Sequence, residues 1–396
     1  MSFLPLIRFK QTFITFSALY LIVWCSNTLA NSINISINYV TVVRDVAPTL
    51  SNIFKMPEDS GYSGAKLAVS DSNTTGKFLK QHFELSYSLL QNSSALINHL
   101  DDVYSSGQRI FIIDAPLEQL IQVNDWAKNK TVILFNSGNS ADKLRKNLCL
   151  NSVFHTIPSN AMKSDALAQW LLTRRMNKVL LIKGDKPEDI QLANSFKRSS
   201  KRFGIKIIDE KQWNFKTDLR RSAQQEIPLF TQTIKDYDVV YVADKSKDFA
   251  EFLPYNTYLP RPVIGSAGME ALAWHGVIEQ WGAAQLQRRF IQLTDRYMNE
   301  KDFAAYVAVR SIAQSVHELH TASSTQIVEH IKSENFELAA YKGRKLSFRQ
   351  WNLQLRMPIA LVHPQGLVSQ SPQPGMIHPV TELDTLGFDI QETQCK

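Results

Sequence analysis

The chain has 396 residues, with 44 Lys and Arg against 37 Asp and Glu, and 44% of its residues are hydrophobic. This length exceeds the roughly 250–300 residues at which a single core stops growing, and the apolar fraction excludes a largely disordered chain. Glycine and proline number only 15 each, which excludes collagen-like and low-complexity sequences.

The first thirty residues have the pattern of a secretory signal peptide. Two bases, Arg8 and Lys10, precede an uncharged run at 13–24, and small residues lead up to a cleavage position after Ala30. The alternative is an uncleaved anchor, although the run is shorter than the roughly 20 residues that span a bilayer. We expect residues 1–30 to be removed and the mature chain to be exported, with no membrane-spanning segment.

The first part of the mature chain alternates short apolar runs with segments of helical periodicity, which is typical of β and α units in turn. Ser93 or Ser94 is expected to cap the second helix. The predicted strands cover 33–43, 83–90, 109–114 and 131–135, and the predicted helices cover 60–72, 93–106 and 117–128.

The same alternation restarts after a break at 140–152. Ser159 is expected to cap the first helix of this second run, and the next helix follows Pro187 and ends near Phe203. The remaining predicted strands cover 152–156, 178–183, 205–208, 237–243 and 262–265, and the remaining helices cover 160–175 and 219–235.

The last third departs from this alternation. Its predicted helices cover 282–298, 303–320 and 325–332. Residues 346–362 alternate like a strand pair, in which Pro358 is limited to an edge or an end.

Successive β and α units predict parallel, doubly wound sheets, so the sequence predicts an α/β fold with two Rossmann-like lobes. We expect lobe 1 to cover 31–152 and lobe 2 to cover 153–280, with the long helices after residue 280 packed back on lobe 1. Two lobes of this kind leave a ligand cleft at the carboxyl ends of their strands.

The cysteines indicate one disulfide. Cys25 lies in the predicted signal peptide, which leaves Cys149 and Cys395 in the mature chain. In an oxidising compartment such an even pair predicts a bridge between the middle of the chain and its tail. Two free thiols are the alternative.

The positive charge does not point to nucleic acid. Loss of the signal peptide lowers the net charge from +7 to +5, because that segment holds two bases and no acids. The densest basic cluster, 197–202, ends a predicted helix, where cations complement the helix dipole. It lacks the interleaved aromatic residues that stack on bases, so we expect no nucleic-acid partner.

Sequence motifs of catalysis are missing. The chain has no G-x-G-x-x-G after its first strand, no P-loop and no G-x-S-x-G elbow. Residues 265–268 resemble a phosphate loop only weakly, and a tight turn is the favoured interpretation. His317 and His320 lack a third metal ligand, and His155 is expected to be a core residue. We therefore expect no enzyme, no metal and no cofactor.

Polar residues follow the carboxyl ends of predicted strands in both lobes, where they would face the cleft. In the second lobe, Asp244 is followed directly by Lys245. Ser159 opens a helix whose backbone N–H groups are suited to an anion, and Tyr62 is placed to stack on a ligand. The candidate ligand-binding residues are Tyr62, Asp114, Asn136, Ser137, Ser159, Asp185 and Asp244.

Several segments resemble the periplasmic solute-binding proteins of ABC transporters, of the type that includes the branched-chain amino-acid receptors. Residues 61–73 resemble their first helix, and 154–159 resemble the segment that leads into their second lobe. The resemblance spans nearly the whole mature chain. Similarity to a subfamily found with PQQ-dependent alcohol oxidation systems is carried by 71–78, 155–162, 165–169 and 384–389, together with Cys395.

The resemblance implies the type I periplasmic binding protein fold, whose two lobes close over a ligand like a hinge. It also implies that the chain returns to lobe 1 over 281–340, and to lobe 2 and a C-terminal tail over 341–396. The amino-acid receptors hold a carboxylate with hydroxyl groups of the fourth-strand loop, where this chain has Ser137 and Ser140.

In functional terms, the resemblance implies a periplasmic protein that captures a small molecule and delivers it to a membrane permease of an ABC transporter, with a link to PQQ-dependent alcohol oxidation. The alternative is a sensory or accessory module of the same fold, which signals to a membrane receptor or assists an exported dehydrogenase.

Overall fold

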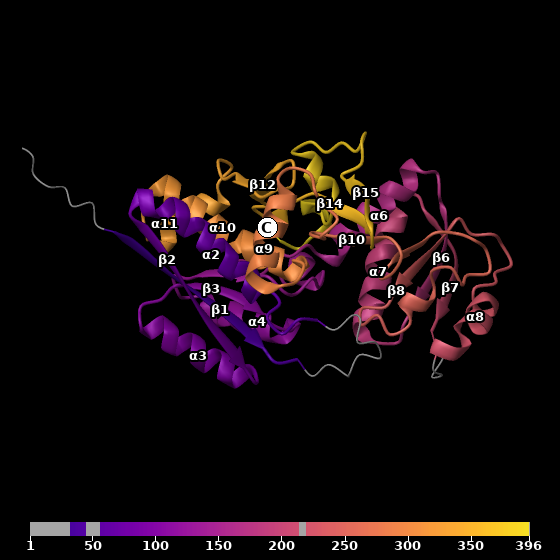
Figure 1. Ribbon diagram of the computed structural model, residues 1–396, viewed down its shortest axis with the longest axis horizontal. Helices are drawn as coiled ribbons and strands as arrows, with labels where there is room; N and C mark the ends of the chain where they lie inside the picture. The colour runs from indigo at the N-terminus through magenta and orange to yellow at the C-terminus, as the bar shows by residue number, and fades with distance from the viewer. Residues whose placement is uncertain (1–31, 45–55, 214–218, 396) are drawn as a thin grey trace, which may run out of the picture.

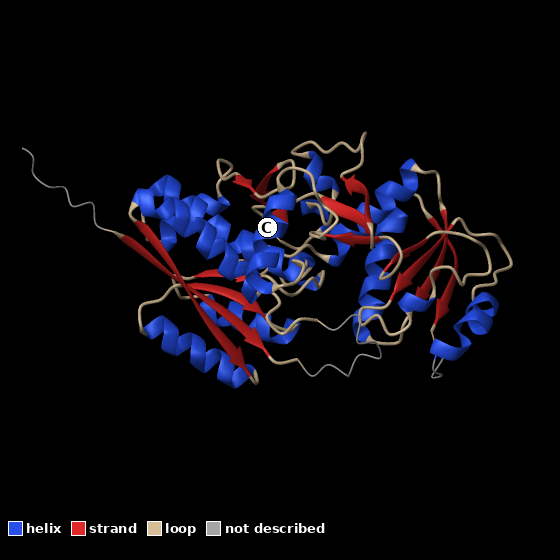
Figure 2. Cartoon of the chain, in the orientation of Figure 1, coloured by secondary structure: helices blue, strands red, loops and turns tan. Residues whose placement is uncertain are grey.

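The structure is a computed structural model that describes residues 32–44, 56–213 and 219–395. The predicted signal peptide, residues 1–30, lies outside the described residues. Two parallel sheets stand at opposite ends of the molecule, and helices cover both faces of each (Figures 1 and 2).

The first sheet has the strand order β2-β1-β3-β4-β5, with all neighbours parallel. Its strands are β1 (Ile33–Val42), β2 (Gln81–Leu90), β3 (Ile110–Asp114), β4 (Ile133–Asn136) and β5 (Val153–His155). All residues of β3 and β4 are buried, as expected for central strands that are covered on both faces. The predicted strands of this sheet are confirmed.

The helices around the first sheet are α2 (Tyr62–Leu79), α3 (Ser93–Ser105), α4 (Leu117–Ala127) and the short α5 (Lys143–Lys146), which was not predicted. Apolar residues of α3 and α4 pack on one face of the sheet. The predicted cap of α3 was wrong: Asn92, one residue before Ser93, accepts a hydrogen bond from the Ala95 N–H at 3.0 Å. Asn, Ser and Thr are all good caps, so composition alone did not distinguish them.

The second sheet is also parallel, in the order β7-β6-β8-β9. It consists of β6 (Lys178–Lys183), β7 (Lys206–Gln212), β8 (Val239–Ala243) and β9 (Val263–Gly265), with the helices α6 (Asn160–Thr173), α7 (Pro187–Arg202) and α8 (Leu219–Phe230). Ser159 caps α6, as predicted, by accepting from the Met162 N–H at 3.2 Å. Phe196 of α7 stacks on Tyr241 of β8, with ring centroids 3.7 Å apart.

The remaining strands form two small antiparallel sheets. One contains β10 (Glu270–Leu272), β14 (Ile359–His363) and β15 (Gly366–Ser371), and the other contains β11 (Leu338–Ala339), β12 (Lys345–Phe348) and β13 (Leu355–Arg356). The strands predicted within 346–362 exist, but they do not form one pair: β13 joins β12, and β14 joins β10 and β15. Pro358 lies at the break between β13 and β14. Alternation indicates a strand and does not indicate its partner.

The sheet of β10, β14 and β15 lies between the two parallel sheets (Figure 1). One continuous apolar core runs through it, from Ile37 and Phe135 of the first sheet to Leu181 of the second. Residues 345–356 contact the first sheet, since Gln354 bridges to His155. The lobe boundaries given above stay a prediction.

The helices of the last third are α9 (Ala283–Thr294), α10 (Glu300–Leu319) and α11 (Ser324–Lys332). α10 begins at a capping box of Asn299 and Asp302 and packs against α2. The two helices approach closely at Gly64, where an added Cβ would lie 1.9 Å from the carbonyl oxygen of Asp302. Within the described ranges, no helix combines the length and the apolarity that a bilayer crossing requires.

The C-terminal tail is anchored to both halves of the molecule. The predicted disulfide is present: Cys149 bonds to Cys395. Just before it, Glu392 pairs with Arg198 of α7, and the Gly387 N–H donates to the buried carboxylate of Asp165 at 2.7 Å. The tail therefore joins α6 and α7 to the segment that follows α5.

We predict that Gly64→Ala lowers the free energy of unfolding by about 1–3 kcal/mol, because the methyl group cannot fit against the α10 backbone. The higher helix propensity of alanine, about 1 kcal/mol, acts in the opposite direction. Urea denaturation measures the change. Lys66→Ala, at an exposed position of the same helix, is the control, and equal stability of Gly64→Ala and wild type would contradict the packing described here.

Removal of the disulfide should also destabilise the fold. The double variant Cys149→Ser/Cys395→Ser is expected to lose about 2–4 kcal/mol, because the bond restricts an unfolded chain over a separation of 246 residues. Urea unfolding without reductant tests this, and wild type treated with dithiothreitol should show the same loss. A double variant that unfolds at the wild-type midpoint would show that the bridge adds no stability.

Candidate functional site

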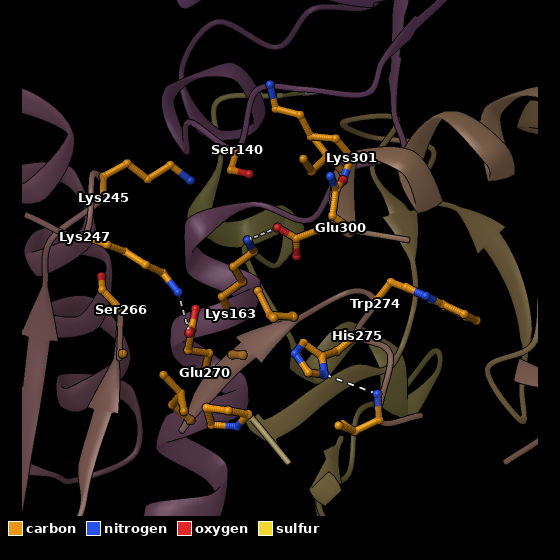
Figure 3. A pocket seen from close by; sticks show the side chains of 18 of the residues that line it. Ser140, Lys163, Lys245, Lys247, Ser266, Glu270, Trp274, His275, Glu300 and Lys301 are labelled. Carbon is orange, nitrogen blue, oxygen red and sulfur yellow. Dashed lines mark hydrogen bonds and ion pairs between the residues drawn. The ribbon is translucent and has the colours of Figure 1, made fainter. Parts of the chain in front are cut away.

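A cavity of about 1050 Å³ is lined by segments from both ends of the molecule. The loop after β4 contributes Gly138 and Ser140, and the segment after β8 contributes Asp244, Lys245 and Lys247. The N-terminal residues of α6 and α10 complete the wall, and Trp274 and His275 come from the segment after β10 (Figure 3). Parallel strands place such loops at their carboxyl edges, where α/β proteins bind ligands.

Charged side chains crowd this cavity, and ion pairs hold most of them. Lys163 of α6 pairs with Glu300 of α10. Lys247 pairs with Glu270 at 2.6 Å (Figure 3). The Lys163–Glu300 pair thus connects α6 to α10.

Lys301 pairs with a carboxylate outside the cavity lining. Its ammonium lies 2.7 Å from Asp114, at the end of β3. Arg44, after β1, contacts the same carboxylate. Burial raises the pKa of Asp114, but the two cations together hold it below the usual value.

Lys245 differs from the other cavity cations. Among residues 32–44, 56–213 and 219–395, no carboxylate forms an ion pair with its ammonium. Its side chain lines the cavity and is exposed. Desolvation and the charge of Lys163 lower the pKa of Lys245 to about 8, against the attraction of Glu300.

Asp244 lines the cavity with its carboxylate turned into the protein. One oxygen accepts from the N–H groups of Phe249 and Ala250, at 2.7 and 2.9 Å, and so holds the start of the short helix η2 (Ala250–Phe252). The other oxygen is buried and accepts no hydrogen bond from any described residue. Asp244 is the one member of the predicted set that lines the cavity.

The predicted residues of the first lobe lie nearby, outside the lining. Asp114 is held by its two cations, as described. Asn136 is buried and bonds to the Asn139 carbonyl oxygen and to His155 Nδ1, at 2.8 and 3.0 Å. Ser137, the first residue of the loop after β4, is fully buried. His155 is fully buried, so its predicted position in the core is confirmed. Burial holds its pKa well below the usual value.

The first N–H groups of α6 already have acceptors within the chain. The Asn160 N–H donates to the Ser140 carbonyl oxygen at 2.9 Å, and the Ala161 N–H donates to the Asp142 carboxylate at 2.8 Å. The Met162 N–H donates to Ser159. The anion that this helix N-terminus binds in the structure is therefore the side chain of Asp142.

The last two predicted residues also lie outside the cavity lining. Tyr62 packs in an aromatic cluster with Tyr39 and Tyr87, at ring-centroid distances of 6.0 and 4.7 Å. Asp185 is exposed after β6. Ligand binding by the seven predicted residues, Asp244 included, stays a prediction.

Sequence reasoning missed Lys163, Glu300, Glu270 and Trp274. They come from separate elements and belong to no local motif, so only the fold brings them together. Lys245 did carry a signal, because it follows Asp244 at the carboxyl end of a buried strand. No group of three or more His, Cys, Asp and Glu side chains suited to a metal occurs among the described residues.

A buried lysine supports the floor of the cavity. Lys342 is 1% exposed and donates to the carbonyl oxygen of Ala273. The backbone N–H of Ala273 donates to the Glu300 carboxylate at 2.8 Å. Glu300 in turn pairs with Lys163. Burial lowers the pKa of Lys342 to about 7, against the attraction of Glu300.

Comparison with known proteins identifies the architecture. No protein-family model and no curated protein sequence matches the chain. Solved structures do match. A substrate-binding protein of an ABC transporter from Sphaerobacter thermophilus superposes with a TM-score of 0.70 at 13% identity, over 90% of this chain and 100% of that one.

Two further structures are similar. The leucine-, isoleucine-, valine-, threonine- and alanine-binding protein from Brucella ovis, in a closed conformation, gives a TM-score of 0.65 at 15% identity, over 83% and 89% of the two chains. An ABC transporter solute-binding protein from R. palustris, in complex with benzoate, gives 0.62 at 11%, over 85% and 96%. The predicted fold is confirmed: the chain has the two-lobed α/β fold of type I periplasmic binding proteins.

The buried lysine predicts a pH dependence of stability. The unfolded state keeps the proton of Lys342 up to about pH 10.4, whereas the folded state releases it near pH 7. Between pH 7 and 10 the folded state therefore binds fewer protons than the unfolded state. Lowering the pH from 10 to 7 favours the unfolded state, so the free energy of unfolding should fall.

The variant Lys342→Met isolates this effect. Relative to the variant, wild type should lose up to about 1.4 kcal/mol per pH unit between pH 10 and 7, as measured by urea denaturation across that range. Lys178→Met, at an exposed position, should keep the wild-type slope. Identical slopes for wild type and Lys342→Met would contradict the assignment.

Proposed function

We propose that this chain is an exported, non-enzymatic solute-binding protein that captures a small molecule between its two lobes. The observation that carries the proposal is the cavity of about 1050 Å³, whose lining comes from both lobes. Its volume suits a small organic ligand. The neighbouring folds support the proposal, because two of them belong to proteins described as solute- or substrate-binding proteins of ABC transporters and the third to an amino-acid-binding protein.

A ligand in this position would act by population shift. It contacts both walls only when the lobes are close together, so its differential affinity stabilises the closed form. The closed form would then be presented to an ABC-type permease. Export by residues 1–30 would place this cycle in the periplasm.

We further propose a link to PQQ-dependent alcohol oxidation. The support is the set of sequence segments that resemble the corresponding subfamily, among them 165–169 and 384–389. In the structure these two segments meet where the Asp165 carboxylate accepts from the Gly387 N–H. These contacts attach the tail to α6 and do not identify the solute. A binding experiment has to identify it.

The test is a thermal-shift screen of alcohols, organic acids, amino acids and PQQ, followed by small-angle scattering with each hit. A true ligand at 100 times its Kd should stabilise the protein by about 2.7 kcal/mol and reduce its radius of gyration. If no compound stabilises the protein and none compacts it, the proposed function is wrong.

A matched pair of variants locates the binding. Ser140→Trp places a large ring in the cavity wall and should abolish the thermal shift. Ser105→Trp, at the exposed end of α3, should keep it. Circular dichroism of both variants without ligand confirms that they fold. Equal shifts in both variants would place the ligand outside this cavity.

A further inference from the structure

We propose that this protein forms a homodimer in which the outer edge of β2 pairs, antiparallel, with β2 of a second copy. The edge concerned is the carboxyl-terminal half of the strand, residues 85–89. The inference goes beyond solute binding and does not depend on it. It follows from the backbone groups of this edge, from a comparison with the other sheet edges and from the symmetry of its side chains.

The first argument concerns the direction of the backbone groups. β2 lies at the end of the first sheet and pairs with β1 in an unbroken register. Successive residues of a strand direct their N–H and C=O groups to opposite sides. The Leu90 carbonyl oxygen faces β1, because it accepts from the Val43 N–H at 2.9 Å. Phe83 faces outward, where the Asn73 side chain bonds to its N–H at 2.8 Å and to its carbonyl oxygen at 2.9 Å.

The same alternation turns the backbone groups of Leu85, Tyr87 and Leu89 outward. Asn73 of α2 occupies the edge at Phe83, in the way that a neighbouring strand would. Beyond it, the outward groups of these three residues form no hydrogen bond with any residue in 32–44, 56–213 or 219–395. A row of unpaired N–H and C=O groups on an edge strand is a template for another strand.

The other edges of the two parallel sheets are covered or protected. At β5 the His155 N–H donates to the Leu353 carbonyl oxygen at 2.8 Å, and at β9 the Gly265 N–H donates to that of Met269 at 3.0 Å. In β7, four of the seven residues are charged, and the register against β6 is irregular. Charges and bulges keep edge strands from pairing. Residues 85–89 have neither, since their sequence is Leu-Ser-Tyr-Ser-Leu and their register is unbroken.

The symmetry of this segment makes a second copy the fitting partner. With a two-fold axis at Tyr87, each Tyr87 lies opposite the other, and Leu85 lies opposite Leu89 of the second copy. Because all these residues face outward, they form hydrogen-bonded pairs that exchange two bonds each, about six in total. The same register sets Glu84 opposite Leu90, so no like charges face each other across the two strands.

Apolar surface accompanies these backbone groups. Tyr87 and Leu89 are 42% and 51% exposed, and pairing would cover part of both side chains. A two-fold contact uses the edge of each copy, so assembly stops at the dimer. One strand pair is a small interface, and we therefore expect a dimer that dissociates on dilution. The second sheet stands at the opposite end of the molecule (Figure 1), so it stays clear of this contact.

The experiment is sedimentation velocity of the purified protein over a series of micromolar concentrations. The variants Tyr87→Lys and Tyr87→Glu are measured alone and as an equimolar mixture. Tyr258→Lys and Tyr258→Glu are the matched controls, at an exposed tyrosine between η2 and β9. Leu89→Lys probes the same edge while leaving Tyr87 packed on Tyr62. Circular dichroism verifies that each variant folds.

We expect wild type and both Tyr258 variants to dimerise with the same Kd. Tyr87→Lys sets two ammonium groups opposite each other at the axis, and Tyr87→Glu sets two carboxylates there. Each variant alone should therefore weaken the dimer by about tenfold or more. In the mixture an ammonium faces a carboxylate, and the Kd should return toward that of wild type. Leu89→Lys should also weaken the dimer, because a lysine on an edge strand disfavours pairing.

Defined results would overturn the proposal. Wild type that stays monomeric at every concentration, or that assembles beyond the dimer, would do so. A dimer that the Leu89→Lys and Tyr87 variants leave intact would use another surface. A mixture that fails to regain the dimer, while the Tyr258 variants keep it, would show that the strands do not meet at Tyr87. None of these results bears on the thermal-shift test of solute binding.

Discussion

A buried guanidinium fixes the wall of the cavity. Arg145 is 1% exposed and donates to the carbonyl oxygens of Asn139, Ala141 and Ile157 at 2.8–3.1 Å, and to Gln354 Oε1 at 2.9 Å. Burial lowers its pKa to about 9. A buried charge is tolerated only when its hydrogen-bonding capacity is satisfied, so these acceptors cannot move apart independently. They belong to the loop after β4, the connection between β5 and α6, and the segment before β13, and the position of Ser140 follows from theirs.

The segments that carry the family resemblance mainly hold the architecture together. The Asp165 carboxylate is fully buried and is satisfied by Arg198, Arg202, Ser199 and the Gly387 N–H. The tail segment 384–389 contributes a second buried carboxylate, Asp384, which binds two arginines from the β12–β13 region. With the disulfide, these contacts hold the tail against both lobes. Such motifs identify a fold reliably and say little about its ligand.

The cavity owes its properties to charges that are paired across large distances in sequence. Lys163 and Glu300 are 137 residues apart, and Lys301 and Asp114 are 187 apart. Pairs between side chains with little exposure are strong organisers, because loss of one partner leaves a charge without compensation. Among the lysines that line the cavity, this pairing leaves only the exposed Lys245 without an ion pair to a described residue.

The sequence by itself determined the elements and the architecture. Apolar runs of period two or with no polar break marked nearly every parallel strand, and their alternation with helical periodicity predicted two parallel sheets with a ligand-binding edge. It also predicted the Ser159 cap and the pairing of Cys149 with Cys395. The partners of β12 to β14 and the lining of the cavity were decided by the tertiary structure. The reason is physical: periodicity reports which face of an element is buried, whereas a site such as that of Lys245, Ser140 and Glu300 depends on which distant elements meet and which charges they neutralise.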